Sequence, residues 1–359
     1  MDTLLRAPDG TPRRPHAVAL FSGGLDSALA VLLMLRQNVE VTALTFMTAF
    51  GCDLSDRSSC GHNPFPAAER FGFRVKLMNL GQDYVEMVQH PRFGRGKNMN
   101  PCVDCRIHML RQAKDYMEMC GADFIITGEV MGQRPFSQVK PRLALTEREA
   151  DVRGLLVRPL SARLLPPTLP EERGWIDRDR LMAFQGRSRK PQMALARELG
   201  LADYPNPASG CLLTDPGYSA RLRDLFSARE FVDLSDLNLL RVGRQFRLSP
   251  ACKAIVGRDE TDNARLLAAA REGETMLEVL EAGSPITLLS GTPTDLDVRR
   301  AAELTARYSD RKRDPLVTVT VTQGRQSTAM VVTPAADSLC RQLRITADDQ
   351  AALPVHSAE

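Results

Sequence analysis

The sequence predicts an α/β protein in which a parallel, doubly wound sheet is followed by a second, smaller α+β domain. Three observations support this fold class. The 359 residues are too many for one ordinary domain. The first half alternates short apolar runs with helix-like patterns, which is typical of a parallel sheet covered on both faces. From about Leu234 the apolar runs become short and closely spaced, which indicates a smaller α+β domain.

Five strands and three helices are expected in the first half. The apolar runs predict strands at residues 17–21, 39–46, 74–80, 124–127 and 155–157. Helical spacing of apolar residues predicts helices at residues 27–36, 66–71 and 105–120. The third helix is the clearest, because apolar residues recur at helical spacing from Ile107 to Cys120 and Gly121 is a natural stop.

The later part of the chain divides at a proline-rich break, RLLPPTLPEERG, at residues 163–174. Helical patterns cover residues 177–200, and the irregular loop YPNPASGCLLTDPG follows. A run PLVTVTVTQG near the end belongs to the smaller domain. We therefore expect an N-terminal tail at 1–15, a first domain at 16–232, a second at 233–335 and a C-terminal tail at 336–359.

Composition limits the classes of function. Hydrophobic content of 43% and charged content of 25% are those of a soluble globular protein. The net charge of +3 is too small for a strongly basic nucleic-acid binder, so any basic surface must be local. No apolar segment reaches membrane-spanning length, and the N-terminal residues lack a signal-peptide core. We expect a cytoplasmic protein with no membrane partner.

The hexapeptide SGGLDS, residues 22–27, stands between a predicted strand and a predicted helix. Gly23 and Gly24 allow backbone N–H groups to approach an anion, and the helix points its positive end at the same place. Ser22 and Ser27 add hydroxyl donors, whereas Asp26 beside a phosphate indicates Mg²⁺. The simpler alternative is a tight turn with a serine cap. The complete motif favours a nucleotide bound with a metal ion.

Three of the eight cysteines are the main candidates for chemistry. Cys102 and Cys105 form a C-x-x-C pair at the start of a predicted helix, where thiols become nucleophiles or metal ligands. Cys211 lies in the loop PASGCLLTD, which is a poor place for core packing. Zinc, an iron–sulfur cluster and a redox pair all remain open on this spacing.

A second group of cysteines lies in the segment GCDLSDRSSCGHN. Cys52 and Cys60, with His62, could complete a zinc site with the C-x-x-C pair. The interpretation that we prefer is a flexible loop over the nucleotide.

Two basic segments are candidates for binding RNA. The stretch RVGRQFRLSPACKAIVGR contains five positive side chains and no acidic residue, a pattern that fits an RNA backbone or a solvated basic face. Its basic residues are Arg241, Arg244, Arg247, Lys253 and Arg258. The second segment, GRSRKPQ, precedes the Cys211 loop and carries Arg187, Arg189 and Lys190.

The motif SGGLDS resembles the SGGxDS signature of the PP-loop ATP pyrophosphatases, which have a sheet of the adenine nucleotide alpha hydrolase-like (HUP) class. The resemblance implies that the loop holds the departing pyrophosphate of ATP while an acceptor oxygen is adenylylated. It further implies adenine recognition near Phe46 and a nucleotide-contacting turn at TGE, which includes Gly128. Relatives often have histidine where this chain has Glu129.

The segment NPCVDC resembles the NPxxxC segment of tRNA 2-thiouridylases. This resemblance places Cys105 at their catalytic cysteine, Cys102 at a position filled by Asp or Cys, and Cys211 at their later cysteine. In one branch of tRNA-thiolating enzymes three such cysteines hold a [4Fe–4S] cluster, which we take as the first hypothesis. The alternative is a persulfide on one cysteine, released by disulfide formation with another. The segment from VGRQFRL to AIVGRDETDN resembles the NFACT-R RNA-binding domain.

These observations together predict an ATP-dependent tRNA sulfurtransferase that adenylylates a uridine carbonyl oxygen and replaces it with sulfur. Its expected cofactors are ATP, Mg²⁺ and the cluster, and its expected partners are tRNA and a sulfur donor, either sulfide or a cysteine desulfurase persulfide. The alternatives are a PP-loop amidotransferase or ligase acting on a small molecule, and a non-catalytic RNA-binding zinc protein.

Overall fold

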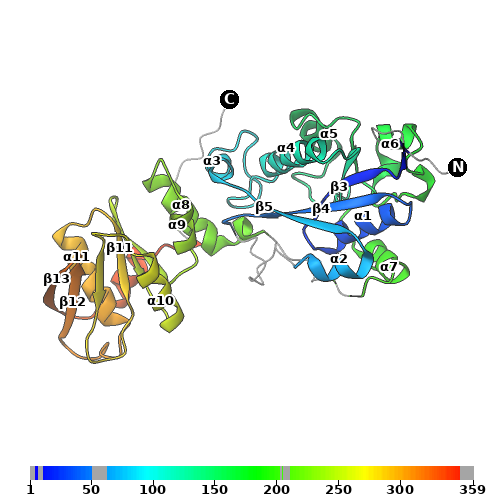
Figure 1. Ribbon diagram of the computed structural model, residues 1–359. Coiled ribbons are helices and arrows are strands. Elements are labelled where there is room, and N and C mark those ends of the chain that lie inside the picture. Colours follow the sequence, from blue (N-terminus) through cyan, green and yellow to red (C-terminus); the bar gives the residue numbers. More distant parts are fainter. Residues whose placement is uncertain (1–4, 7–10, 51–62, 203, 205–210, 348–359) are drawn as a thin grey trace. The chain divides into compact units, whose positions relative to one another are not determined.

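The computed structural model describes residues 5–6, 11–50, 63–202, 204 and 211–347, and the chain forms two compact units (Figure 1). The units are Met1–Thr214 and Asp215–Glu359. The domain boundary expected at residues 232–233 lies within the second unit, between α8 (Pro216–Ala228) and α9 (Leu234–Leu239). Helix α8 is tied to the second unit because its Asp224 accepts hydrogen bonds from Arg247.

The first unit is built on a five-stranded parallel sheet with the order β5-β4-β3-β6-β7. Its strands are β3 (His16–Leu20), β4 (Glu40–Met47), β5 (Arg74–Asn79), β6 (Phe124–Thr127) and β7 (Leu156–Val157). All five predicted strands are present, with ends within one residue of those expected. A short antiparallel pair, β1 (Leu5–Arg6) and β2 (Pro12–Arg13), precedes them.

Helices cover both faces of this sheet, with α1, α2 and α7 on one side and α4 and α5 on the other (Figure 1). They are α1 (Leu25–Leu35), α2 (Phe65–Phe71), α3 (Gln82–Gln89), α4 (Cys102–Met119), α5 (Lys140–Glu149), α6 (Leu169–Glu172) and α7 (Lys190–Glu198). Three 3₁₀ turns occupy Ala162–Leu164, Arg178–Arg180 and Leu212–Thr214. The doubly wound parallel architecture predicted for this part is confirmed.

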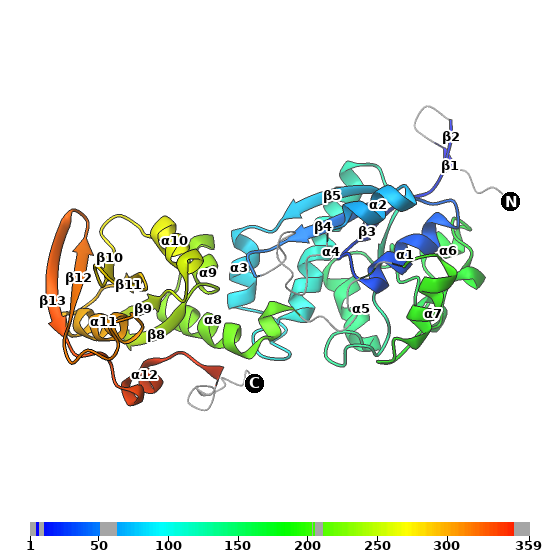
Figure 2. The same cartoon turned by 90° about the horizontal axis from the view of Figure 1, so that it is seen from below.

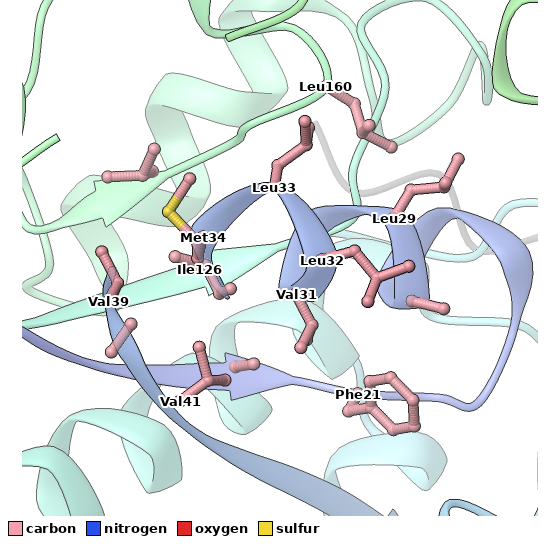
Figure 3. Close-up of a cluster of buried hydrophobic side chains, with 14 of the residues drawn as sticks. Phe21, Leu29, Val31, Leu32, Leu33, Met34, Val39, Val41, Ile126 and Leu160 are labelled. Carbon is pink, nitrogen blue, oxygen red and sulfur yellow. The ribbon is translucent and has the colours of Figure 1, made fainter. Parts of the chain in front are cut away.

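The core of the first unit lies between α1 and the sheet (Figure 3). Leu29 and Leu32 on the helix join Val41 on β4 and Ile126 on β6 in one buried cluster. Every residue of the central strand β3 is buried, as expected for a parallel strand covered on both faces. Burial of this apolar surface holds the N-terminus of α1 at the carboxyl edge of the sheet.

The second unit is a six-stranded antiparallel sheet with the order β13-β12-β10-β11-β9-β8. Its strands are β8 (Arg244–Ser249), β9 (Cys252–Val256), β10 (Thr275–Glu278), β11 (Thr287–Gly291), β12 (Val317–Gln323) and β13 (Gln326–Val332). Figure 2 shows β12 and β13 as a long hairpin at one edge. Its other helices are α10 (Glu260–Ala269), α11 (Asp295–Arg307) and α12 (Asp337–Leu343).

Helix α11 packs against this sheet through a core of its own, in which Phe246, Ala302 and Val319 are completely buried. The smaller α+β domain predicted from the change in sequence pattern is thereby confirmed. None of the helices in the described part of the chain is both long and apolar enough to span a membrane.

Lys253 lies in the middle of β9, and only 4% of its surface is exposed. Its Nζ atom is 3.4 Å from Oε1 of Gln245. Burial lowers the pKa of this lysine from 10.5 to about 8. The folded unit therefore binds the Lys253 proton more weakly than the unfolded chain does.

We predict that Lys253→Met raises the free energy of unfolding by roughly 1–3 kcal/mol at neutral pH, because it removes a buried charge. Since the folded-state pKa is lowered, the wild-type protein regains this stability as the pH rises from about 8 to 10.5. Urea denaturation of both proteins at neutral and alkaline pH measures the difference, which should shrink at the higher pH. A variant that is less stable than the wild type at neutral pH would contradict the prediction.

Candidate active site

The SGGLDS loop connects the end of β3 to the first turn of α1. Gly23 has a φ of +73°, a backbone conformation that favours glycine. The hydroxyl of Ser27 donates a 2.9 Å hydrogen bond to the carbonyl oxygen of Gly24, and the hydroxyls of Ser22 and Ser27 are 3.3 Å apart. Helix α1 begins at Leu25, two residues earlier than expected, so Asp26 stands in its first turn.

The carboxylate of Asp26 is already engaged by two side chains from other segments. Its Oδ2 atom accepts a 2.9 Å hydrogen bond from Nε2 of Gln133 and forms an ion pair with Arg189, which directly precedes α7. Burial raises the pKa of the Asp26 carboxyl, and Arg189 opposes that effect. Within the described residues, the Oδ1 atom of Asp26 is buried without a hydrogen-bond partner. An orphaned carboxylate oxygen of this kind fits a Mg²⁺ ion.

Gly128 follows β6 and touches the backbone of the first turn of α1. A Cβ atom at Gly128 would lie 2.5 Å from the carbonyl carbon of Asp26 and 2.5 Å from the backbone nitrogen of Ser27. No side chain fits there without moving the helix. The glycine of the TGE turn therefore sets how closely β6 and the phosphate loop approach.

Glu129, at the position where relatives often have histidine, is the centre of a buried ion-pair network. Its Oε2 atom accepts hydrogen bonds from Nε of Arg158 at 3.0 Å and from the hydroxyl of Thr127 at 3.2 Å. Its Oε1 atom lies 3.2 Å from Nε of Arg106, and Arg158 is paired in turn with Glu147. Burial alone would raise the pKa of Glu129, but the two arginines hold it below its usual range.

This network gives Glu129 a physical role that the sequence left open. Arg106 directly follows Cys105 on α4, and its guanidinium group is held by the buried carboxylate of Glu129. The network therefore holds a positive charge beside the C-x-x-C pair.

Both cysteines of the pair lie in the first turn of α4, because the helix begins at Cys102 and not at residue 105 as expected. The hydroxyl of Tyr84, on α3, donates a 3.1 Å hydrogen bond to Sγ of Cys105. Burial raises the pKa of the Cys102 thiol, while the nearby Arg134 and Arg106 partly oppose that shift. The two sulfur atoms therefore have different environments.

Cys211 precedes the 3₁₀ turn Leu212–Thr214, which is tied to the segment before α4. The backbone N–H of Met99 donates to the carbonyl oxygen of Leu213 at 3.1 Å. The amide of Asn98 donates to the carbonyl oxygen of Thr214 at 2.7 Å. These bonds bring the turn that follows Cys211 to the segment that leads into α4, although more than a hundred residues separate them in sequence.

One cavity of about 270 Å³ joins these parts of the first unit. Its lining includes nearly every nucleotide and cysteine residue predicted from the sequence: Ser22, Gly24, Asp26, Ser27, Phe46, Gly128, Cys102, Cys105 and Cys211. It also includes side chains that the sequence analysis did not assign to the site, which are Tyr84, Arg106, Gln133, Arg134 and Arg189. Two of these residues, Gln133 and Arg134, begin five residues after Gly128 of the TGE turn, so their position in the sequence could have indicated that they belong to the site.

The [4Fe–4S] hypothesis requires three cysteine sulfur atoms that are close enough to hold the cluster together. Within residues 11–50, 63–202 and 211–347, no group of three or more His, Cys, Asp or Glu side chains is arranged to hold a metal ion. Cys105 instead accepts a hydrogen bond from Tyr84, and Cys102 faces Arg134. The described residues therefore contain no preformed set of three sulfur ligands for a [4Fe–4S] cluster. Cys52, Cys60 and His62 lie outside the described residues.

The basic residues expected to bind RNA are largely engaged within their own units. Arg189 lies in the cavity against Asp26 and not on an exposed patch, whereas Arg187 and Lys190 are exposed. In the second unit Lys253 is buried, and the guanidinium group of Arg244 stacks over the ring of Tyr308 at 4.6 Å from the ring centroid.

Arg247 is paired with Asp224 at 2.6 Å, and Arg258 is paired with Asp262 at 2.6 Å. Arg241 is half-buried and also has interaction partners. The acidic partners stand outside the basic stretch, so its local sequence suggested a more open positive surface than the fold provides.

Two family models match the chain, each within one unit. Residues 13–162 match the family described as thiamine biosynthesis protein (ThiI), and residues 243–343 match the NFACT protein RNA binding domain. The chain therefore carries a ThiI-family PP-loop domain and an NFACT-R domain, as the sequence motifs predicted.

Curated relatives resemble the PP-loop part. The chain is 30% identical over 132 residues to a tRNA-specific 2-thiouridylase MnmA of Pseudomonas aeruginosa, which covers 34% of this chain and 35% of that protein. It is 32% identical over 123 residues to the MnmA of Methylococcus capsulatus, over 32% of this chain and 33% of the relative. The chain thus spans about a third of the length of these relatives. A 4-thiouridine synthetase solved with RNA and ATP has a TM-score of 0.31 and 19% identity, and the match covers 54% of each chain.

We predict that Glu129→Gln lowers the free energy of unfolding by about 3 kcal/mol at neutral pH, because Arg158 stays buried with one partner fewer. Since the folded-state pKa of Glu129 is lowered, its contribution is present above the ordinary glutamate pKa and is lost as the pH falls through the folded value. Urea denaturation at neutral pH and at about pH 4 should show the gap from wild type shrinking in acid. Glu118→Gln, at an exposed position on α4, is the matched control and should change little.

We also predict that Tyr84→Phe slows the alkylation of Cys105 at neutral pH by roughly fivefold, the equivalent of one hydrogen bond of about 1 kcal/mol. The phenol stabilises negative charge on the sulfur, while a phenylalanine ring keeps the contacts with Phe50 and His108. Reaction with iodoacetamide, followed by mass spectrometry of the Cys105 peptide, measures the rate. Tyr116→Phe, on α4, serves as the control, and an unchanged rate in the Tyr84 variant would refute the prediction.

Proposed function

We propose that this chain, with its ThiI-family and NFACT-R domains, is an ATP-dependent tRNA sulfurtransferase that converts a uridine carbonyl into a thiocarbonyl. One observation carries the proposal: the phosphate-binding loop, the C-x-x-C pair and Cys211, which come from three separate segments, line the same cavity. An amidotransferase or ligase needs no such group of sulfur atoms. A non-catalytic RNA-binding protein needs neither the loop nor Asp26.

The loop side of the cavity suits ATP. Backbone N–H groups of the glycine loop and the N-terminus of α1 supply partial positive charge for the pyrophosphate that leaves. Arg134 and Arg189 add full charges on the cavity wall. Asp26 would hold Mg²⁺, which supplies neutralisation of phosphate charge when it is bound. These fixed groups stabilise the charge that develops as the uridine oxygen is adenylylated.

The cysteine side of the cavity supports sulfur transfer through a persulfide. The sulfur donor is a cysteine desulfurase persulfide. The thiolate of Cys105 or Cys211 attacks its outer sulfur, and the donor's S–S bond breaks so that the desulfurase cysteine leaves as a thiolate. The transferred sulfur attacks the activated uridine carbon, and the carbon–oxygen bond breaks so that AMP leaves with the electron pair. The other cysteine then attacks the inner sulfur, which forms a protein disulfide and releases the thiouridine. An external dithiol reduces the disulfide before the next turnover.

The RNA partner is tRNA, by analogy with the relatives. The NFACT-R domain supports RNA binding by the second unit. In the first unit, the exposed Arg187 and Lys190 flank Arg189, which lines the cavity. They are suited to contacts with the RNA backbone.

The test is tRNA thiolation with ATP, a cysteine desulfurase and cysteine, measured by mass spectrometry of digested tRNA. We expect Cys105→Ser and Cys211→Ser each to lower the rate by about 100-fold or more, because each sulfur takes part in bond formation. Cys102→Ser should keep measurable activity, since a persulfide route needs two cysteines. Cys120→Ser, at the exposed C-terminal end of α4, is the control.

Anaerobic purification with iron analysis separates the two routes. A protein that contains iron and loses activity in all three cysteine variants would replace the persulfide route with the cluster. A protein that thiolates no tRNA in the presence of ATP and a sulfur donor would overturn the proposed function itself.

A further inference from the structure

Oδ1 of Asp26 and Oε1 of Gln133 are buried acceptor oxygens that have no hydrogen-bond partner in the described part of the chain. The amide of Gln192, three residues after Arg189 on α7, also reaches Asp26 and opposes the rise that burial causes in the pKa of its carboxyl. A buried polar atom without a partner costs free energy, and such atoms in one place indicate a missing ligand.

The chemistry of these atoms says what kind of ligand is missing. The amide of Gln133 has a defined orientation, because its Nε2 atom must face the carboxylate oxygen to which it donates. Its Oε1 atom is therefore directed away from that bond and, like Oδ1 of Asp26, is a buried acceptor without a partner among the described residues. Two acceptor oxygens, one of them charged, call for a cation or a donor and not for an anion. Both residues line the cavity that holds the phosphate loop.

We propose that Gln133 is a ligand of the divalent cation that accompanies ATP, with its Oε1 atom and Oδ1 of Asp26 as the two protein oxygens. Mg²⁺ is commonly held by one or two protein oxygens, with phosphate oxygens and water in the remaining positions. Oxygen ligands of this hardness favour Mg²⁺ over softer metals. The proposal rests on the proposed function to the extent that ATP occupies the loop.

Arg189 has a separate role in this arrangement. It is paired with Oδ2 of Asp26, the oxygen that also accepts from Gln133, and so leaves Oδ1 to the metal. Its charge on the cavity wall attracts the nucleotide phosphates whether or not the metal is present. The two residues therefore differ in a way that an experiment can separate: Gln133 acts through the metal, and Arg189 acts on the nucleotide directly.

The experiment compares the affinity of the full chain for α,β-methylene ATP in excess Mg²⁺ and in EDTA, by titration calorimetry. The ratio of the two dissociation constants measures how strongly metal and nucleotide binding are coupled. Wild type should bind at least about tenfold more tightly with Mg²⁺, and Gln133→Met should lose most of that ratio, as the loss of a metal ligand costs roughly 10–100-fold. Arg189→Met should bind more weakly in both buffers and keep the ratio.

Two further variants guard against indirect effects. Gln326→Met replaces an exposed glutamine on β13 of the second unit, outside the cavity, so it should leave both affinities unchanged. Gln133→Glu keeps a ligand oxygen but loses the amide donor, so it should preserve the Mg²⁺ ratio. Circular dichroism of each variant confirms that the fold is retained.

The outcomes distinguish this inference from the proposed function. A folded Gln133→Met protein with the wild-type Mg²⁺ ratio would overturn the metal role while ATP binding stands. Loss of the ratio in Gln133→Glu as well would show that Gln133 only positions Asp26 through its donor. A wild-type protein that binds no nucleotide in either buffer would overturn the proposed function and the inference with it.

Discussion

The close approach of β6 to the start of α1 is the constraint on which the rest of the site depends. Strands β3 and β6 are parallel neighbours, with Leu20 opposite Thr127, so the segments that follow them emerge at the same edge of the sheet. Only a glycine at position 128 lets the backbones meet, because a Cβ atom there would overlap the first turn of the helix. This contact places the phosphate loop beside the TGE turn, and every other part of the cavity is arranged around that pair.

Electrostatics then divides the cavity into two ends. At one end Asp26 shares an oxygen between Arg189 and Gln133, and its other oxygen stays available for a cation. At the other end the buried Glu129 holds Arg106 beside the cysteines. Glu129 is thus the anchor of a buried ion-pair network. Arginines therefore supply positive charge both beside the SGGLDS loop and beside the cysteines.

Tyr84 shows that the two cysteines of the C-x-x-C pair are not equivalent. Its hydroxyl donates a hydrogen bond to Cys105, while Cys102 faces Arg134. The two sulfur atoms therefore have different hydrogen-bond partners and different charged neighbours. The second unit has its own core and engages its basic strand residues internally: Arg247 pairs with Asp224, Arg244 stacks on a tyrosine ring, and Lys253 is buried.

The sequence by itself determined the parallel sheet, the change of fold in the second half, the phosphate loop and the three cysteines. Each of these depends on residues adjacent in the chain or on a regular apolar pattern, which local physical chemistry already constrains. Only the tertiary structure decided the partners of the charged groups. Arg189 meets Asp26 across 163 positions, Arg158 meets Glu129, and Arg247 meets a carboxylate outside its basic stretch. The local sequence around a charged residue does not identify its ion-pair partner, because pairing depends on which elements the buried core brings together.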